Sequence, residues 1–211
     1  MIRKGAEANL YLARLFGRDV LVKERVSKSY RVDSLDQEIR SYRTVHEAQM
    51  IHEARKVGVS TPTVYLVDEQ EYKIFMEYVQ GPRLKEALAT MSPKERASIC
   101  RVVGGLIGKL HGNQLIHGDL TTSNMILTGE ETVSLIDFGL SFQSSQVEDR
   151  GVDIHLMRRA LNSTHFAYAE SCFRSVVDGY RFMMGSKLAE TVLTRAKEIE
   201  RRGRYFAERR A

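Results

Sequence analysis

One short segment constrains this chain more than any other: residues 117–127, His-Gly-Asp-Leu-Thr-Thr-Ser-Asn-Met-Ile-Leu. Asp119 precedes Asn124 by five positions, and Asp137 follows in an Asp-Phe-Gly tripeptide. In phosphoryl transfer, one carboxylate orients an attacking oxygen and accepts its proton, while an amide and a second carboxylate hold metal ions that bridge phosphates. The spacing therefore predicts Asp119 as the catalytic base and Asn124 and Asp137 as metal ligands.

Two short runs rich in β-forming residues bracket these side chains. Residues 125–127 and 133–136 are joined by Thr-Gly-Glu-Glu, which favours a hairpin. Antiparallel pairing would bring Asn124 and Asp137 to the same end, and magnesium suits a carboxylate, an amide and phosphate oxygens. The alternative is that these residues only cap a loop and form an ordinary turn. Their combined order and spacing disfavour that alternative.

The N-terminal part offers candidate phosphate contacts. Residues 18–23 read as a strand that ends in Lys23, and Gly5 precedes it in a possible phosphate-covering loop. The stretch 33–57 predicts a long polar helix, and its Glu47 is our candidate for an ion pair that aims Lys23 at phosphate. An ordinary hairpin turn at Gly5, a solvated lysine and a solvated glutamate are the alternatives.

Downstream, a predicted strand at 72–79 runs into Gln-Gly-Pro and breaks into a turn. This segment can serve as an adenine-binding hinge, with the backbone C=O of Glu77 and N–H of Val79 facing the purine edge; a plain strand exit is the alternative. A helix then begins at a Ser92-Pro93 capping signal and repeats apolar residues at three- and four-residue steps. We expect that helix to be core and to carry no chemistry.

Together these motifs resemble the small atypical kinase family of the KEOPS (EKC) complex, also called the PRPK or bud-site-selection kinase family. The resemblance covers nearly the whole chain. It is more specific than a general kinase signature, because ordinary protein kinases have Arg in place of Gly118 and usually Lys in place of Thr121. The segments that carry it are 5–8, Lys23, 43–48, 117–124, 137–140, 147–153 and 159–165.

The resemblance implies one α+β domain, 1–211, with a minimal bilobal protein-kinase-like fold. It has a sheet-rich N-lobe (1–80), a truncated helical C-lobe (81–202) and a basic C-terminal tail (203–211). The implied cofactors are ATP and Mg²⁺ or Mn²⁺. The expected site residues are Asp119 for catalysis; Gly5, Ala6, Glu7, Lys23, Glu47, Glu77 and Val79 for ATP; Asn124 and Asp137 for metal; and His117 and Asp153 as support of the catalytic loop. An aspartate that merely caps a helix would look the same as Asp153.

The implied function is an atypical serine/threonine kinase and/or ATPase. It would phosphorylate a protein hydroxyl, its own included, or water, within the KEOPS complex that makes threonylcarbamoyladenosine in tRNA. The expected partners are the other KEOPS subunits, especially the threonylcarbamoyl-transferase subunit, and tRNA through the complex. At 211 residues the chain is short for a protein kinase, and no long activation segment or Ala-Pro-Glu follows Gly139. Only helices near 149–162, 166–184 and 187–201 are expected there, so we expect control by bound partners rather than by phosphorylation.

The C-terminal end is basic, with seven Arg and Lys residues against three Glu between 195 and 211. Arginines beside aromatic residues can grip a phosphate backbone, so a tRNA contact is a hypothesis for Arg201, Arg202, Arg204, Arg209 and Arg210. The alternatives are a solvated helix end or a tail that reaches the cleft. No apolar run long enough for a membrane and no signal peptide are evident, so we expect a cytoplasmic protein without membrane contact.

Three other functions compete with the leading one. A RIO-type kinase is disfavoured by Asp-Phe-Gly, and an aminoglycoside-type phosphotransferase is disfavoured by the short C-terminal region. A pseudokinase scaffold is disfavoured because Lys23, Asp119, Asn124 and Asp137 are all present.

Overall fold

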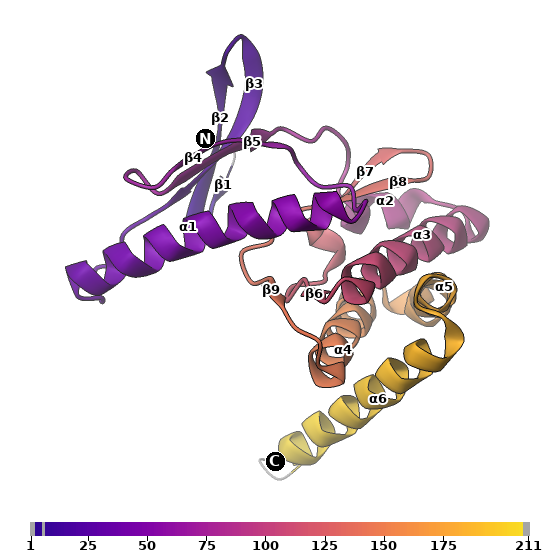
Figure 1. Cartoon of the computed structure of the whole chain (residues 1–211). Coiled ribbons are helices and arrows are strands. Elements are labelled where there is room, and N and C mark those ends of the chain that lie inside the picture. Colours follow the sequence, from indigo (N-terminus) through magenta and orange to yellow (C-terminus); the bar gives the residue numbers. More distant parts are fainter. Residues whose placement is uncertain (1–2, 6, 209–211) are drawn as a thin grey trace.

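The computed structural model describes residues 3–5 and 7–208, and Figure 1 shows their arrangement. A β-sheet lies at one end, helix α1 crosses beneath it, and a group of helices forms the other end. This N-terminal antiparallel sheet with a helical C-terminal region confirms the predicted α+β class. Within the described residues no helix is long and apolar enough to cross a membrane.

The N-terminal sheet has five antiparallel strands in the order β1-β2-β3-β5-β4. Their bounds are Arg3–Lys4 (β1), Ala8–Leu15 (β2), Arg18–Arg25 (β3), Val64–Asp68 (β4) and Lys73–Glu77 (β5). In the central strand β3, Lys23 pairs with Leu10 on one side and Ile74 on the other. Because a one-residue slip would turn every side chain to the opposite face, this pairing fixes the direction in which Lys23 points.

Helix α1 spans Asp33–Lys56 and packs against the sheet, where Ala48 meets Ile74 and Met76 in a small apolar cluster. Its first turn is acidic and its last turn is basic, which complements the helix dipole. Glu47 lies on the buried face, next to Ala48, and is only 1% exposed. The helix therefore brings a carboxylate into the interior beneath the central strand.

The C-terminal region consists of helices and two small two-stranded sheets, β6–β9 and β7–β8. Its elements are α2 (Leu84–Thr90), α3 (Pro93–Gly112), β6 (Leu115–Ile116), the 3₁₀ turn η1 (Thr122–Asn124), β7 (Met125–Gly129), β8 (Thr132–Leu135), β9 (Phe142–Gln143), α4 (Val147–Thr164), η2 (Phe166–Tyr168), α5 (Ala169–Met184) and α6 (Ser186–Glu208). The predicted hairpin is confirmed, because β7 and β8 pair antiparallel. The capping signal before α3 is also confirmed, because Ser92 and Glu95 form a reciprocal capping box.

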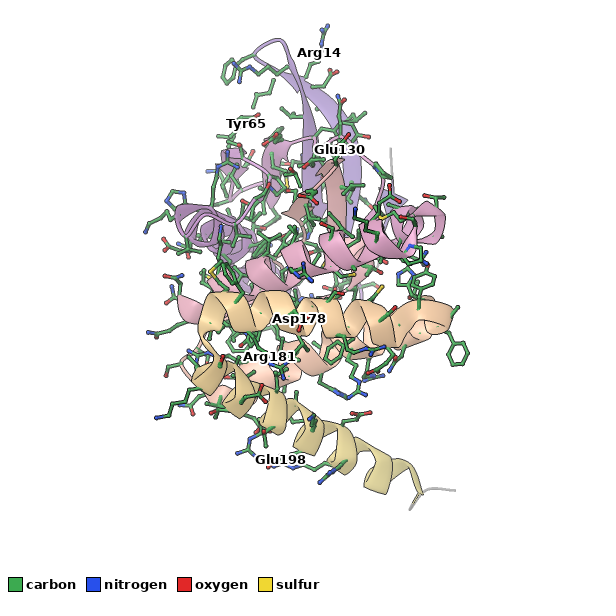
Figure 2. All side chains as sticks on the ribbon, turned by 90° about the vertical axis from the view of Figure 1, so that its right-hand side faces the viewer. Arg14, Tyr65, Glu130, Asp178, Arg181 and Glu198 are labelled. Atoms are coloured by element: carbon green, nitrogen blue, oxygen red, sulfur yellow. The ribbon has the colours of Figure 1, made fainter. Side chains whose placement is uncertain are left out.

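Helices α3 and α5 form the centre of this region, and Figure 2 shows them with α6 as successive layers below the sheet. Two glycines permit the close approach of α3 and α5. A Cβ on Gly104 would lie 1.9 Å from the carbonyl oxygen of Val176, and one on Gly179 would lie 1.9 Å from that of Arg101. Larger residues would force the helices apart, so the tight packing of this core depends on both glycines.

The last helix differs from the sequence-based expectation of 187–201, since α6 continues to Glu208. The proposed tail, 203–211, therefore begins inside a helix. The arginine, glutamate and alanine residues around Gly203 favour a helix, and a single glycine in a helix interior costs only about 1 kcal/mol.

Candidate nucleotide-binding and catalytic site

A cleft of about 230 Å³ lies between the sheet and the β7–β8 hairpin. It is lined by Leu10, Leu21, Lys23, Glu47, Pro62, Met76, Glu77, Tyr78, Val79, Gly81, Arg83, Asn124, Ile126, Ile136 and Asp137. A neighbouring hollow of about 430 Å³ shares Lys23, Asn124 and Asp137 with it and adds Gly5, Glu7, Arg25, Arg43, Asp119, Thr121, Ser123, Gly139 and Leu140. One end of the combined cleft is thus largely apolar and the other end is charged.

Lys23 stands at the junction of the two hollows. Its Nζ donates to Glu47 Oε1 on α1 and to Asp137 Oδ1 after β8, each at 2.7 Å. The three residues come from strand, helix and turn, 24 and 114 positions apart in sequence. The fold therefore joins the lysine to the helix glutamate chosen from the sequence and also to the Asp-Phe-Gly aspartate.

The charges in this group stabilise one another. Burial lowers the pKa of Lys23, but the carboxylates of Glu47 and Asp137 outweigh it, so the pKa lies above its ordinary value. Burial likewise raises the pKa of Asp137, while Lys23 and the Gly139 N–H more than compensate, so that pKa lies below its ordinary value. Both groups are therefore ionised at neutral pH.

Asp119 and Asn124 are in direct contact. The Asn124 amide donates to Asp119 Oδ2 at 2.7 Å and to the Asp119 carbonyl oxygen at 3.1 Å. Asn124 ends the 3₁₀ turn η1, and its carbonyl oxygen accepts from the N–H of Ile136. The loop therefore holds Asp119, Asn124 and Asp137 around the same hollow, as the hairpin argument anticipates.

The backbone of the catalytic loop is tied to α4. Asp153 is fully buried, and its two carboxylate oxygens accept from the N–H groups of His117 at 2.8 Å and Gly118 at 2.9 Å. Gly118 has a φ of +79°, and a Cβ there would lie 2.3 Å from the carbonyl oxygen of Leu140. The packing therefore requires glycine at the position where ordinary kinases carry arginine.

His117 packs beneath the loop. Its ring lies 4.7 Å from the ring of Phe138, centroid to centroid, and its Nδ1 accepts from the Asp119 N–H at 3.3 Å. Burial lowers the pKa of His117 despite the nearby carboxylates, so the ring is neutral at neutral pH. An uncharged ring in this position links the Asp-Phe-Gly segment to the loop that bears Asp119.

The proposed nucleotide-covering loop is only partly described. Gly5 donates its N–H to the carbonyl oxygen of Ala8, and Glu7 forms an ion pair with Arg43 of α1 at 2.9 Å. Both Gly5 and Glu7 line the charged hollow. Ala6 lies outside the described residues.

At the other end of the cleft, Glu77 and Val79 line the apolar hollow. The Glu77 carboxylate turns to Thr63, accepting from its N–H at 3.0 Å and its hydroxyl at 2.9 Å. The Glu77 side chain therefore points to the residue that precedes β4, and residues 77–79 line the cleft.

The basic residues of the C-terminal end lie on α6. Arg201 and Arg202 are exposed, and Arg202 pairs with Glu148 at 3.1 Å. The side chain of Arg204 and all of Arg209 and Arg210 lie outside the described residues.

Sequence reasoning missed three residues that support the site. Arg25 pairs with Glu47 at 2.5 Å, and its alternation with Lys23 along β3 was a usable signal. His111 lies on α3, the helix expected to be core, and it contacts Asp153 at 3.3 Å. The hydroxyl of Tyr180 on α5 contacts the other nitrogen of His111 at 3.0 Å. Helical periodicity identifies apolar core positions and gives no sign of the polar contacts of His111 and Tyr180.

The comparisons with known proteins agree with this geometry. The protein kinase domain family model matches residues 5–167. The chain is 44% identical over 211 residues to the KEOPS complex subunit Bud32 of Pyrococcus abyssi, with 97% of this chain and 96% of that protein covered. It is 39% identical to the EKC/KEOPS complex subunit bud32 of Dictyostelium discoideum, with 97% of this chain and 82% of that protein covered.

A further relative is longer. The chain is 42% identical to the probable bifunctional tRNA threonylcarbamoyladenosine biosynthesis protein of Methanothermobacter thermautotrophicus, with 97% of this chain but 36% of that protein covered. The sequence-based resemblance to the KEOPS kinase family is confirmed, and a protein kinase domain implies ATP binding. The chain belongs to the protein kinase domain family and, within it, to the family of Bud32 subunits of the KEOPS complex.

Proposed function

We propose that this chain transfers the γ-phosphoryl group of Mg-ATP to a serine or threonine hydroxyl, its own included, or to water, as the kinase subunit of a KEOPS-type complex. The observation that carries the proposal is the convergence of Lys23, Asp119 and Asp137 on one cleft, each held by a polar partner. The match to the protein kinase domain supports ATP as the nucleotide.

The apolar end of the cleft is the place we assign to adenine. Leu21, Met76 and Ile126 supply flat apolar walls, and the backbone of Glu77 to Val79 borders the same space. Apolar walls with a few polar backbone groups are typical of nucleotide-base pockets. In our proposal the C=O of Glu77 and the N–H of Val79 contact the purine edge.

Lys23 is assigned to the nucleotide phosphates, and Gly5 and Glu7 to the loop that covers them. Its raised pKa keeps Lys23 cationic, and Glu47 fixes its direction. Phosphates entering the charged hollow would compete with Asp137 for the ammonium. The pair with Glu47 can persist during that exchange, because Glu47 uses a separate contact on Lys23.

Asn124 and Asp137 are assigned to the metal. Both offer oxygen ligands, which fits Mg²⁺ or Mn²⁺, and the Asn124 N–H₂ points to Asp119, so that its Oδ1 is left for a cation. The ion would neutralise charge on the phosphates when bound with ATP. No group of three or more His, Cys, Asp and Glu side chains in residues 3–5 and 7–208 could hold a metal by itself. The phosphates would therefore complete the coordination.

Asp119 is assigned as the group that orients the acceptor oxygen and takes its proton. Asn124 occupies Asp119 Oδ2, which leaves Oδ1 available to the acceptor. Asp153 accepts from the two N–H groups that precede Asp119 and His117 accepts from the Asp119 N–H, so both are positioning residues in this proposal. A carboxylate held in this way fits transfer to a hydroxyl or to water equally well.

The family supports a role in a tRNA-modifying assembly. One relative is named for tRNA threonylcarbamoyladenosine biosynthesis and is bifunctional. We infer that a separate threonylcarbamoyl-transferase subunit supplies the second activity to this chain, together with other KEOPS subunits. The basic residues of α6 and its end, Arg201, Arg202, Arg204, Arg209 and Arg210, remain our candidates for contact with tRNA, and deletion of residues 203–211 should then weaken tRNA binding.

The test is ATP turnover by the purified chain, alone and with the other KEOPS subunits and tRNA. We expect Asp119→Ala and Asp137→Ala to abolish turnover. Asp178→Ala is the matched control, because Asp178 lies on α5 well away from the sheet (Figure 2) and 55% of its side chain is exposed. Turnover that survives both cleft substitutions would remove the assignment, and an inactive wild type in every mixture would favour a scaffold.

A further inference from the structure

Arg25 forms the buried end of the charge network at the cleft. It follows Lys23 by two positions on β3, so both side chains leave the same face of the strand. Its Nη2 donates to Glu47 Oε2 at 2.5 Å, while Lys23 donates to Oε1 at 2.7 Å. Each oxygen of the Glu47 carboxylate therefore has its own cation.

The burial of these groups makes the second cation necessary. Glu47 is 1% exposed and Arg25 is 6% exposed, so water does not compensate either charge. A buried carboxylate needs a partner for each oxygen if it is to keep one orientation. With Lys23 alone, Glu47 Oε2 would have no cation, and the carboxylate would not be held in one orientation while Lys23 exchanges Asp137 for phosphate.

Arg25 also ties the pair to its surroundings. Its Nη2 donates to the carbonyl oxygen of Arg43 on α1 at 3.3 Å, and its backbone N–H donates to Tyr72 in the turn before β5. Gly139 packs close by, since a Cβ there would lie 3.4 Å from Glu47 Oε2 and 3.5 Å from Arg25 Nη2. Sheet, helix and Asp-Phe-Gly segment thus meet at one guanidinium.

We propose that Arg25 is a positioning residue that keeps Glu47, and through it Lys23, in place while Lys23 exchanges Asp137 for the nucleotide phosphates. The proposal rests on the proposed function of the cleft. It means that the lysine–glutamate pair is held by a side chain of the central strand. In the described segment between Gly139 and α4, residues 140–146, no basic residue is present that could do this instead.

The chain contains a matched control on the same helix. Asp36 of α1 is 2% exposed and is also held by two arginines, with Arg40 Nε at 2.6 Å and Arg31 Nη1 at 3.3 Å. The Arg40 guanidinium stacks on Tyr72 at 3.9 Å, and the residues that line the two cleft hollows include neither Arg40 nor Asp36. Arg40→Met therefore breaks a similar buried pair outside the site.

The experiment is a double-mutant cycle with Arg25→Met and Glu47→Gln in the full chain, with kcat and KM for ATP measured separately. We expect Arg25→Met to lower kcat/KM about 10-fold or more in the wild-type background and only about 2-fold in the Glu47→Gln background. Arg25→Lys keeps the charge and should restore part of the loss. Arg40→Met should lower kcat/KM by the same factor in the wild-type and the Glu47→Gln backgrounds.

Affinity for a fluorescent ATP analogue, measured by titration, separates this proposal from the proposed function. We expect Arg25→Met to weaken that affinity and Asp119→Ala to leave it nearly unchanged. Turnover that survives Asp119→Ala removes the catalytic assignment, while the coupling of Arg25 to Glu47 in analogue binding still tests the present proposal. Equal effects of Arg25→Met in both backgrounds would overturn it. If Arg25→Met does not fold, the cycle is run with Arg25→Lys instead. A loss of kcat/KM in Arg25→Lys that is the same with and without Glu47→Gln would then overturn the proposal.

Discussion

The two halves of the candidate site are held by different kinds of interaction. On the sheet side, Arg25, Glu47, Lys23 and Asp137 alternate in charge along a chain of contacts 2.5–2.7 Å long. These contacts join side chains to side chains. The last member, Asp137, is half exposed, so this chain of charges opens into the cleft.

On the helical side the contacts end on the backbone. Tyr180, His111 and Asp153 are all fully buried, and they connect α5, α3 and α4 in that order. Asp153 then accepts the N–H groups of the catalytic loop. Because a carboxylate only accepts, His111 donates from Nε2 to Asp153, while its Nδ1 lies 3.0 Å from the Tyr180 hydroxyl.

The difference indicates a division of tasks. Side-chain ion pairs at the edge of a cleft can exchange partners when a charged ligand arrives. Buried hydrogen bonds to backbone groups cannot be exchanged without leaving a polar group unpaired, so they fix geometry. We therefore expect substitutions on the sheet side to affect turnover more than stability, and substitutions on the helical side to affect both.

The largest effect is expected for Lys23→Met. Loss of the ammonium should lower kcat/KM for ATP by about 100-fold or more, as for other charged groups that stabilise a transition state. Arg25 still compensates Glu47, so the free energy of unfolding should fall less than in the helical-side variants. Turnover assays and urea unfolding measure the two quantities. Lys73→Met, which removes a lysine paired with Glu71 and Glu24 outside the cleft, should leave turnover unchanged.

The next effect is expected for Asp153→Asn. An amide can accept only one of the two backbone N–H groups and would turn its own N–H₂ toward the other, so we expect a loss of about 3 kcal/mol in the free energy of unfolding. Turnover should fall with it, because the loop that bears Asp119 loses its anchor. Asp149→Asn, in the first turn of the same helix, should cost much less. A stable but inactive Asp153→Asn would contradict the division of tasks.

A smaller effect is expected for Tyr180→Phe. Removal of the hydroxyl leaves His111 Nδ1 buried without its hydrogen-bond partner, which should cost about 1–2 kcal/mol of stability. Burial raises the pKa of Tyr180, so the hydroxyl stays protonated throughout the working range. Tyr168→Phe is the matched control, because it removes a similar hydroxyl–imidazole contact, 3.2 Å to His165, that is only part-buried. An equal loss of stability in Tyr180→Phe and Tyr168→Phe would show that burial of the Tyr180 contact does not add to the free energy of unfolding.

Much of the sheet side could be predicted from sequence. Lys23, Glu47 and Asp137 belong to local patterns, namely a strand end, an apolar rhythm on a helix and a tripeptide, and the fold brings these three together. The α+β class was implied by the family resemblance, and the structure confirms it. Arg25 was missed because a charged residue at a strand end is usually solvated.

The helical side was much harder to predict. Asp153 was expected from the family resemblance, but His111 and Tyr180 lie in apolar helices whose periodicity indicates only a core. Their contact depends on the approach of α3 and α5, which is set by glycines 75 positions apart, Gly104 and Gly179. Periodicity within one helix carries no information on such a distant match. The end of α6 also differs from the expected 187–201, since the helix continues through Gly203 to Glu208.

The smallest effect concerns pH and separates the two sides again. Burial is the largest cause of the lowered pKa values of His117, His155 and His165, all in the helical region. Below the ordinary histidine pKa of about 6.5 the unfolded chain binds protons that the folded chain does not. The contribution of the three histidines to the free energy of unfolding is therefore complete above that pH and declines as the pH falls below it. Lys23 and Asp137 stay ionised across this window, since the pKa of one is raised and that of the other is lowered. Urea unfolding at pH 7.5 and pH 5.5 should show a loss of stability at the lower pH, and the loss should be smaller in His155→Gln. An equal loss in both proteins would show that the partly buried imidazole of His155 is not its source.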